Sequence, residues 1–533
     1  MAKQIFIWII LAALCCSALS FYSIGLHSLG LPFQLDYGEG MCWWQSVHIS
    51  DYTVAYKPMD HYPYMVVHYP PLYHLAAREF GAVLHDWMIA ARLLSLISAA
   101  GTGLAIGALI FASVPRKSPL SYRLTAALFG ACIVYSVDSM QFARFARVDM
   151  MSVFLTFAAL AVFVVFWDSI PAQVIAIILS VAAAFTKQTS YTGLVVVLFV
   201  LLLADPRRAA ALSLLAITLT AVSVGYLTRV THGGFLLNTV SYNVNPFSIR
   251  QMAILIETHY SKSVLLLACG AGESIGLFAY LVRMGIASIP RRVRAALAKS
   301  PSHRALFILT IHLLLAGAQV LSVGKQGAYI NYFLLFDLTC GALAGFLLFR
   351  LLLGWKKGRA PAPVPSTAAA LLLCGVLLPL PPQIGGAVRS PAQRALEQQH
   401  RDAYTAALKL VRGTPGLVYS EDMRLLMDAG KEVPAEPAIV SALSAAGRWD
   451  EGPFRQMFIN RRFDLVVVYE DLSNPFRFTR GVRDAIEANY QPTRISGDFT
   501  VFRPRVERAS AVQQVLTLVE HPEKDPPVSD SAH

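Results

Sequence analysis

Residues 5–40 read IFIWIILAALCCSALSFYSIGLHSLGLPFQLDYGEG, an apolar run that ends in a short acidic motif. The apolar part is at least as long as the roughly 20 residues that a helix needs to cross a bilayer, so it predicts a first transmembrane helix over 5–29. No small-x-small cleavage site follows, and we therefore interpret this segment as a retained span and not as a cleaved signal peptide. Asp36 and Glu39 come directly after it, which predicts two carboxylates at a membrane surface.

The rest of the chain has the same apolar character. Of its 533 residues, 55% are hydrophobic and only 15% are charged, whereas soluble proteins carry about 25% charged residues. This composition predicts a polytopic all-α membrane bundle with a small C-terminal extracytoplasmic α/β domain. By the length rule we count about eleven transmembrane helices, at 5–29, 87–113, 122–138, 149–167, 171–186, 190–204, 209–229, 263–287, 305–323, 329–351 and 367–381.

The basic residues are concentrated in short connectors between the apolar runs. The formal net charge of +12 would alone suggest nucleic acid, but this distribution is typical of a membrane protein, and we predict no nucleic-acid partner. By the positive-inside rule, the connectors and Lys3 mark the cytoplasmic side of the membrane, so we expect the N-terminus to be cytoplasmic. The connectors are Arg116-Lys117, Arg207-Arg208, Arg291-Arg292-Val293-Arg294 with Lys299, and Lys356-Lys357-Gly358-Arg359.

The loops at 30–86 and 230–262 and the chain after about 382 then face the outside. We expect a transmembrane domain over 1–382 and an extracytoplasmic α/β domain over 383–512. Short apolar runs at 417–419, 464–469 and 499–502 predict buried strands in that domain. Residues 513–533 are polar and rich in proline and serine, so we expect a disordered tail.

The first outer loop holds the candidate catalytic residues, Asp36 and Glu39. A carboxylate here could act as a general base on an alcohol or bind a divalent cation. The alternative is a helix end capped by Asp36. The spacings of His61, His68 and His74 fit no ligand pattern well, and we predict no dedicated metal site. The many tyrosines and tryptophans of this loop suit either an interfacial anchor or stacking on sugar rings.

Cations from three other segments map to the same outer side. Arg144 and Arg147 lie three residues apart, so they share a face of a helix, and the guanidinium fork suits phosphate or carboxylate. Lys187 interrupts an apolar run, where a lysine must face water, protein or an anionic ligand; a snorkelling turn residue is the alternative. Lys325 follows a later span. Together with the carboxylates, they predict an anionic lipid headgroup held beside a base.

These motifs, in this order, resemble the GT-C superfamily of membrane glycosyltransferases, especially the bacterial family-39-like branch with aminoarabinose transferases and protein O-mannosyltransferases. Asp36-Tyr-Gly-Glu39 stands where that branch has an acidic motif, often two adjacent acids. His68-Tyr69-Pro70-Pro71-Leu72-Tyr73 is similar to its Tyr-x-Pro-Leu segment, Arg147-Val-Asp149 to its Arg-x-Asp, and Lys187 to its lysine after the fifth span. The resemblance covers roughly residues 1–350.

The resemblance implies an inverting hexosyl- or pentosyltransferase that moves a sugar from a polyprenyl-phosphate donor to an envelope lipid, glycan or protein. Asp36 or Glu39 would be the base. Arg144, Arg147, Lys187 and Lys325 would bind the donor phosphate. The substrate-binding residues would be His68, Tyr69, Tyr73, Asp149, Gln188, Asn331 and Tyr332.

Two other functions fit a membrane protein of this composition. A lipid-linked sugar transporter or flippase would need broken helices and charges near the bilayer midplane, whereas the cations noted above gather at one face. A non-catalytic envelope assembly protein would work through its C-terminal domain, in which the sequence contains no catalytic constellation.

Overall fold

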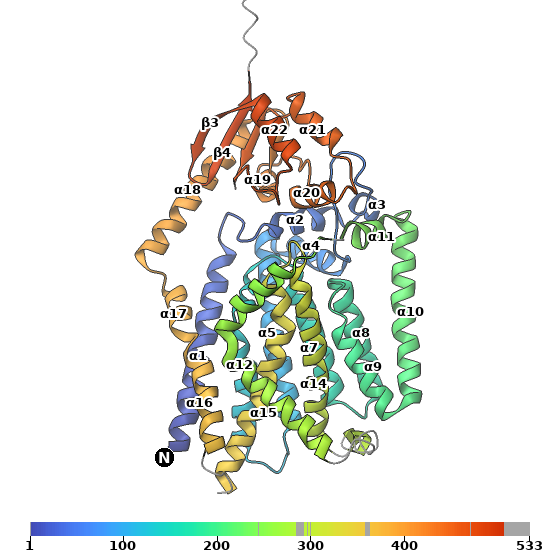
Figure 1. The fold of residues 1–533 in the computed structure, drawn as a ribbon, viewed down its shortest axis with the longest axis vertical. Coiled ribbons are helices and arrows are strands. Elements are labelled where there is room, and N and C mark those ends of the chain that lie inside the picture. Colours follow the sequence, from blue (N-terminus) through green and yellow to red (C-terminus); the bar gives the residue numbers. More distant parts are fainter. Residues whose placement is uncertain are drawn as a thin grey trace, which may run out of the picture.

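The computed structural model describes residues 2–243, 245–283, 293–295, 297–298, 300–357, 363–469 and 471–505. A bundle of helices forms one part of the molecule, and the C-terminal domain covers the end of the bundle opposite the N-terminus (Figure 1). The predicted tail over 513–533, residues 506–512, and the connector residues Arg291, Arg292, Lys299, Gly358 and Arg359 lie outside the described residues.

A helix lies at each predicted span. These helices are α1 (Ala2–Leu29), α5 (Trp87–Ser113), α6 (Leu120–Ile133), α7 (Asp149–Val165), α8 (Ile170–Thr186), α9 (Thr192–Ala204), α10 (Pro206–Val230), α12 (Ile249–Arg283), α14 (Pro301–Val320), α15 (Leu334–Lys357) and α16 (Pro363–Leu377).

The predicted number of about eleven spans is not confirmed. Six helices of the described chain are long and apolar enough to cross a membrane, or up to eight if each of two bent pairs counts as one span. The other three, α7, α8 and α9, are apolar but have only 17, 17 and 13 residues, which is shorter than the roughly 20 that a perpendicular span needs. The chain is thus a multi-pass membrane protein.

Small residues let the central helices approach closely, as is common where helices pack in a membrane. A Cβ atom at Gly103 of α5 would lie 2.7 Å from the carbonyl oxygen of Ala131 in α6. Of the six long apolar helices of the described chain, the one over Ile330–Gly354, which includes most of α15, is the most buried. This interior fixes the ends of the helices from which the site is built.

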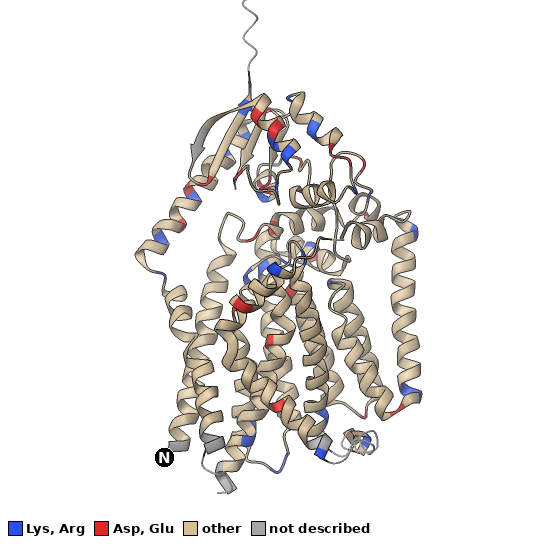
Figure 2. Ribbon diagram, viewed as in Figure 1, with Lys and Arg blue, Asp and Glu red and all other residues tan. Residues whose placement is uncertain are grey.

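A layer of short elements lies between the bundle and the C-terminal domain (Figure 1). The first loop supplies α2 (Gly38–His48), α3 (Tyr52–Ala55) and α4 (Leu72–Leu84). Later segments add η2 (Asp138–Arg144), α11 (Gly234–Thr239), η3 (Ser241–Asn243), η5 (Leu321–Gly324) and η6 (Ile330–Phe333). Figure 2 shows Lys and Arg residues near the N-terminal end of the bundle and a second group within this layer.

The C-terminal domain is an α/β domain, as predicted. Helices α17 (Leu380–Val388) and α18 (Pro391–Gly413) lead into a sheet of four strands in the order β1-β2-β4-β3. Strands β1 (Val418–Ser420) and β2 (Leu465–Val468) are parallel, and β4 (Phe499–Pro504) is antiparallel to both β2 and β3 (Tyr490–Ser496). Four helices complete it: α19 (Met423–Asp428), α20 (Pro437–Ala445), α21 (Gly452–Ile459) and α22 (Arg480–Asn489). All three predicted strands are present, and β3 is additional.

The C-terminal domain packs tightly on the first loop. Buried side chains of α2 and α19, such as Trp44 and Leu425, belong to one hydrophobic cluster. Tyr64 forms a backbone bridge with Ala435, and Arg424 donates to the carbonyls of Leu31 at 3.2 Å and Phe33 at 2.6 Å. The two parts of the chain therefore form one continuous structure.

Candidate functional site

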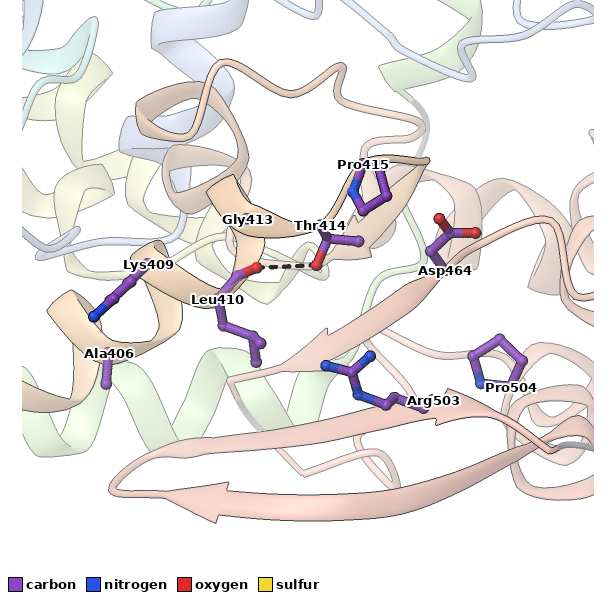
Figure 3. A pocket seen from close by; sticks show the side chains of 9 residues that line it. All are labelled: Ala406, Lys409, Leu410, Gly413, Thr414, Pro415, Asp464, Arg503 and Pro504. Carbon is purple, nitrogen blue, oxygen red and sulfur yellow. Dashed lines mark hydrogen bonds between the residues drawn. The ribbon is translucent and has the colours of Figure 1, made fainter.

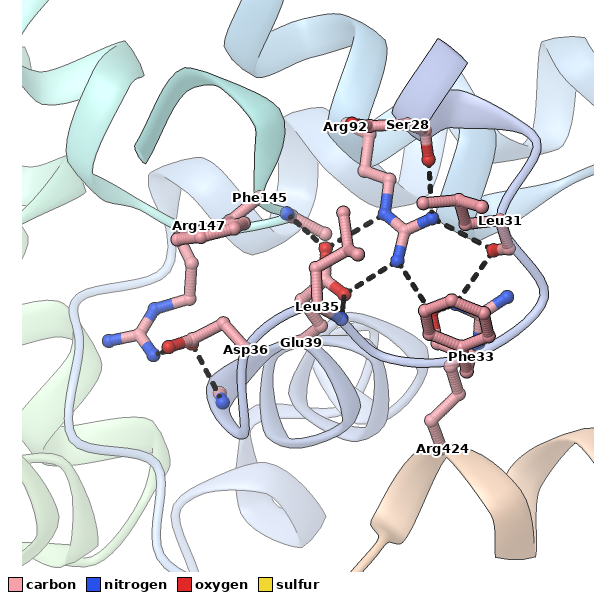
Figure 4. Close-up of polar contacts among 12 residues, drawn as sticks. Ser28, Leu31, Phe33, Leu35, Asp36, Glu39, Arg92, Phe145, Arg147 and Arg424 are labelled. Atoms are coloured by element: carbon pink, nitrogen blue, oxygen red, sulfur yellow. Dashed lines mark hydrogen bonds and ion pairs between the residues drawn. The ribbon is translucent and has the colours of Figure 1, made fainter. Parts of the chain in front are cut away.

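Glu39 is held inside the protein by Arg92 of α5 (Figure 4). Both side chains are 0% exposed, and the guanidinium donates to both carboxylate oxygens, at 2.8 and 2.7 Å. The backbone N–H groups of Leu35 and Ala146 donate to the same oxygens, at 2.7 and 2.9 Å. Burial alone raises the pKa of Glu39, but the hydrogen bonds and charge of Arg92 outweigh it and lower the pKa. Glu39 thus joins three segments as a fixed anion.

Asp36 lies on the other side of this turn and forms an ion pair with Arg147 (Figure 4). Its Oδ1 also accepts from the N–H of Gly38 at 2.9 Å, at the start of α2, whose N-cap residue is Tyr37. Among the described residues, both contacts of this carboxylate use Oδ1, and the side chain is 26% exposed. Oδ2 is therefore available to a second partner.

Asp149 and Lys187 form a second, buried ion pair. Asp149 opens α7, and Lys187 follows the last residue of α8, so each charge lies at the helix end that the helix dipole favours. Lys187 Nζ is 2.6 Å from Asp149 Oδ1, and Asn331 donates to the same oxygen at 2.8 Å. Lys187 also faces the ring of Tyr332, at 5.0 Å from its centroid. The four residues unite α7, α8 and η6.

A cavity of about 960 Å³ opens between the bundle and the C-terminal domain. It is lined by nine predicted site residues: Asp36, His68, Tyr69, Arg147, Lys187, Gln188, Lys325, Asn331 and Tyr332. The other four do not line it. Glu39 and Asp149 support it from behind as described, Tyr73 is 0% exposed within the hydrophobic cluster, and Arg144 lies against the ring of Phe145 at 5.7 Å.

A second hollow, of about 730 Å³, lies on the C-terminal domain and is built by Ala406, Lys409, Leu410, Gly413, Thr414, Pro415, Asp464, Arg503 and Pro504 (Figure 3). No predicted site residue lines it. The larger cavity is therefore the candidate active site.

The C-terminal domain supplies one wall of the candidate active site, which the sequence analysis did not foresee. Glu436 accepts a hydrogen bond from the hydroxyl of Tyr37 at 2.6 Å, and the Arg477 guanidinium covers the ring of Tyr37 at 3.6 Å. Burial raises the pKa of Glu436. No local signal marked these residues, because only the docking of the domain brings them to the first loop.

Arg250 and Gln251, at the start of α12, also line the cavity and were not predicted. Arg250 and Lys325 are both exposed. They therefore offer positive charge at the cavity in addition to Arg147 and Lys187, which already face carboxylates. Arg250 had a usable signal, since it is a cation within the predicted outer loop at 230–262, where helix α12 already begins.

Asp36 and Glu39 are the two carboxylates that were considered as ligands of a divalent cation. Among the described residues, no group of three or more His, Cys, Asp and Glu is arranged to hold a metal ion. Asp36 and Glu39 point to different partners, Arg147 and Arg92. A cation shared by these two carboxylates does not fit this arrangement.

Comparison with solved structures shows that other membrane proteins share this fold. ArnT from Cupriavidus metallidurans bound to undecaprenyl phosphate superposes with a TM-score of 0.55 and 14% identity over 95% of this chain and 99% of that chain. Its apo form gives a TM-score of 0.53 with 14% identity, over 94% and 98%. The apo oligosaccharyltransferase of Archaeoglobus fulgidus gives 0.52 with 12% identity, over 91% and 73%. No protein-family model matches the chain, and no curated protein matches its sequence.

The chain therefore has a GT-C-like fold, and the resemblance drawn from its motifs is confirmed at the level of the fold. The likeness extends to the C-terminal domain, because it covers 95% of this chain.

Proposed function

We propose that this protein is a membrane glycosyltransferase that moves a sugar from a polyprenyl-phosphate donor to an envelope lipid, glycan or protein. The proposal rests on the position of the Asp36 carboxylate. Its carboxylate lines the cavity with one oxygen available, and cations from five other segments line the same cavity. The fold is shared with an ArnT structure that holds undecaprenyl phosphate.

In the proposed reaction, Asp36 accepts the proton of an acceptor hydroxyl through Oδ2. The acceptor oxygen bonds to the anomeric carbon, and the bond from that carbon to the phosphate oxygen breaks with inversion. The electron pair leaves with the lipid phosphate. Arg250 and Lys325, which face no carboxylate in the described contacts, are well suited to bind this phosphate. Such preorganised charges commonly lower a barrier by several kcal/mol, about 2.7–4 for a single donor.

In the proposed reaction, Arg147 and Lys187 hold the carboxylates of the site in place. Each holds a carboxylate of the site, Asp36 and Asp149 respectively, so each can turn toward the phosphate only by weakening that pair. We assign Glu39 a positioning role, since its four hydrogen bonds leave it no direct access to the cavity. We further propose that the membrane is the bacterial inner membrane and that the cavity opens on its outer face, as positive-inside statistics favour.

The proposal is tested by Asp36→Asn. Mass spectrometry of envelope lipids, glycans and proteins, from cells with and without the gene, identifies the product. Because a general base usually contributes roughly 10²- to 10⁴-fold, product formation with this variant should fall by that factor while the protein stays folded and inserted. Asp51→Asn is the matched control, since Asp51 is an exposed helix cap outside the cavity lining. Full activity of Asp36→Asn would exclude Asp36 as the base.

A lipid-linked sugar transporter is the second candidate, because two helix pairs are bent by 79° and 90°, and broken helices are typical of transporters. The two functions separate in Asp36→Asn. A transporter with this variant would still move the lipid-linked sugar across reconstituted vesicles, and the wild type would form no glycosylated product.

A further inference from the structure

One side of the cavity carries uncharged polar groups that the fold leaves without partners. His68 Nδ1, Gln188 Oε1 and Thr189 Oγ1 are buried and make no hydrogen bond among the described residues. The three side chains line the same cavity, and Gln188 Nε2 donates to the carbonyl of His68 at 2.8 Å. Buried polar groups are almost always paired in folded proteins. Three such groups on one wall therefore indicate the place of a ligand.

The three side chains are uncharged at neutral pH and therefore suit an uncharged ligand. Burial and the charge of Arg147 lower the pKa of His68 to about 4, so its imidazole is uncharged at neutral pH. The Gln188 oxygen only accepts, the Thr189 hydroxyl donates and accepts, and a neutral imidazole nitrogen does one or the other. Vicinal hydroxyls of a sugar, which donate and accept at adjacent positions, can satisfy all three.

The charges around this wall do not favour a charged sugar. Asp36 and Asp149 face Arg147 and Lys187, and Glu436 accepts from Tyr37 and from the N–H of Ile439 at 2.7 Å. An ammonium group would enter a cavity lined by five Lys and Arg side chains and only two carboxylates, those of Asp36 and Glu436. A carboxylate group would meet the lone pairs of Gln188 Oε1.

We propose that His68, Gln188 and Thr189 form the donor-sugar subsite and that they select an uncharged, hydroxyl-rich sugar over amino sugars and uronic acids. This inference rests on the proposed function. It assigns the class of the transferred group, which the fold alone does not specify.

The test measures binding of synthetic donors to the full-length protein in lipid nanodiscs. The probes share one lipid: undecaprenyl phosphate alone, and its esters with glucose, mannose, galactose or arabinose, with 4-amino-4-deoxyarabinose, and with galacturonic acid. We expect at least one neutral donor to bind at least tenfold more tightly than both charged donors and more tightly than the bare lipid phosphate. A preference for the amino sugar or the uronic acid, or equal affinity for all probes, would overturn the subsite.

Thr189→Val is the sharpest variant, because it replaces a hydroxyl that has no partner among the described residues by a methyl group of similar size. It should weaken the preferred donor by roughly 2- to 12-fold, the value of one neutral hydrogen bond, and leave undecaprenyl phosphate unchanged. Thr186→Val is the control, since the Thr186 hydroxyl is bonded to the carbonyl of Ala182 at 2.9 Å and lies outside the lining. Equal affinities for Thr189→Val and the wild type would contradict the assignment.

Gln188→Glu tests the charge argument directly. A carboxylate at this position should weaken the neutral donor and strengthen the amino-sugar donor, so that their affinity ratio changes by at least tenfold. An unchanged ratio would count against the subsite. If undecaprenyl phosphate and every ester fail to bind the wild type, the proposed function itself fails, and this result is distinct from a wrong sugar preference.

Discussion

Replacing Glu39 with glutamine should destabilise the protein strongly, because it leaves the guanidinium of Arg92 without a counter-charge in a fully buried place. Each Glu39 oxygen accepts two hydrogen bonds, from Arg92 and from a backbone N–H. The amide nitrogen of glutamine would face two of these donors with a donor of its own. Breaking a buried pair by removing one partner typically costs about 3–5 kcal/mol, and we expect a loss in this range.

The assay is the free energy of unfolding of the purified protein in mild detergent, followed by fluorescence during titration with a denaturing detergent. The double variant Glu39→Gln with Arg92→Met should recover part of the loss, because it also removes the uncompensated charge. Asp36→Asn should cost much less, since Asp36 is partly exposed and both its bonds use one oxygen. Burial alone raises the pKa of Glu39, but Arg92 outweighs burial and lowers it. The contribution of the Glu39–Arg92 pair to the free energy of unfolding is therefore fully present above the ordinary pKa of a glutamate. It is lost as the pH falls through the lowered pKa.

The result that would refute this reasoning is a Glu39→Gln variant with the wild-type free energy of unfolding and no transferase activity. Glu39 would then act on a substrate, and the roles of base and positioning residue would have to be exchanged. The present assignment would be supported if Glu39→Gln loses stability, and if Asp36→Asn loses activity while it keeps most of its stability.

Three further predictions concern other parts of the site and the C-terminal domain. Gly38→Ala should reduce transfer with little loss of stability, because the new Cβ would displace the flexible guanidinium of Arg147 from Asp36; wild-type turnover would refute it. Lys325→Ala should weaken undecaprenyl phosphate binding by roughly 10- to 150-fold, the value of one charged hydrogen bond, and the effect should shrink in high salt. Burial raises the pKa of Asp422 to about 7, so the folded state retains a proton there and stability falls as pH rises from about 4 toward 7. Asp422→Asn should flatten this part of the melting-temperature profile, and an unchanged slope would contradict the assignment.

Much of the fold was predictable, because hydropathy is a local signal. Every expected span contains a helix, and the apolar runs marked β1, β2 and β4. Strand β3 was missed because its sequence, YQPTRIS, is polar and contains a proline, as suits an edge strand. The number of spans was not predictable in the same way, since the apolar runs of α7, α8 and α9 give helices shorter than a full crossing.

Some residues of the candidate site were predictable from local sequence, and others were not. Asp36, Arg147 and Lys187 were predicted because each is a charge at the end of an apolar run, and the structure brings all three to one cavity. Arg92 was missed, but its position was a signal. An arginine inside an apolar helix almost always has a specific partner. Glu436 and Arg477 had no such signal, since they reach the cavity only through contacts with Tyr37, from which they are separated by 399 and 440 residues.

The docking of the C-terminal domain on the first loop also sets an order of events during synthesis. The ribosome delivers the acidic motif first, while the residues that complete the cavity, including Arg477, follow only about 440 residues later. A half-made chain could hold its spans in the bilayer yet would lack a finished chamber for the sugar. A premature stop anywhere before Arg477 is thus expected to give an inserted but inert product, because the proposed activity needs the C-terminal domain docked on the first loop.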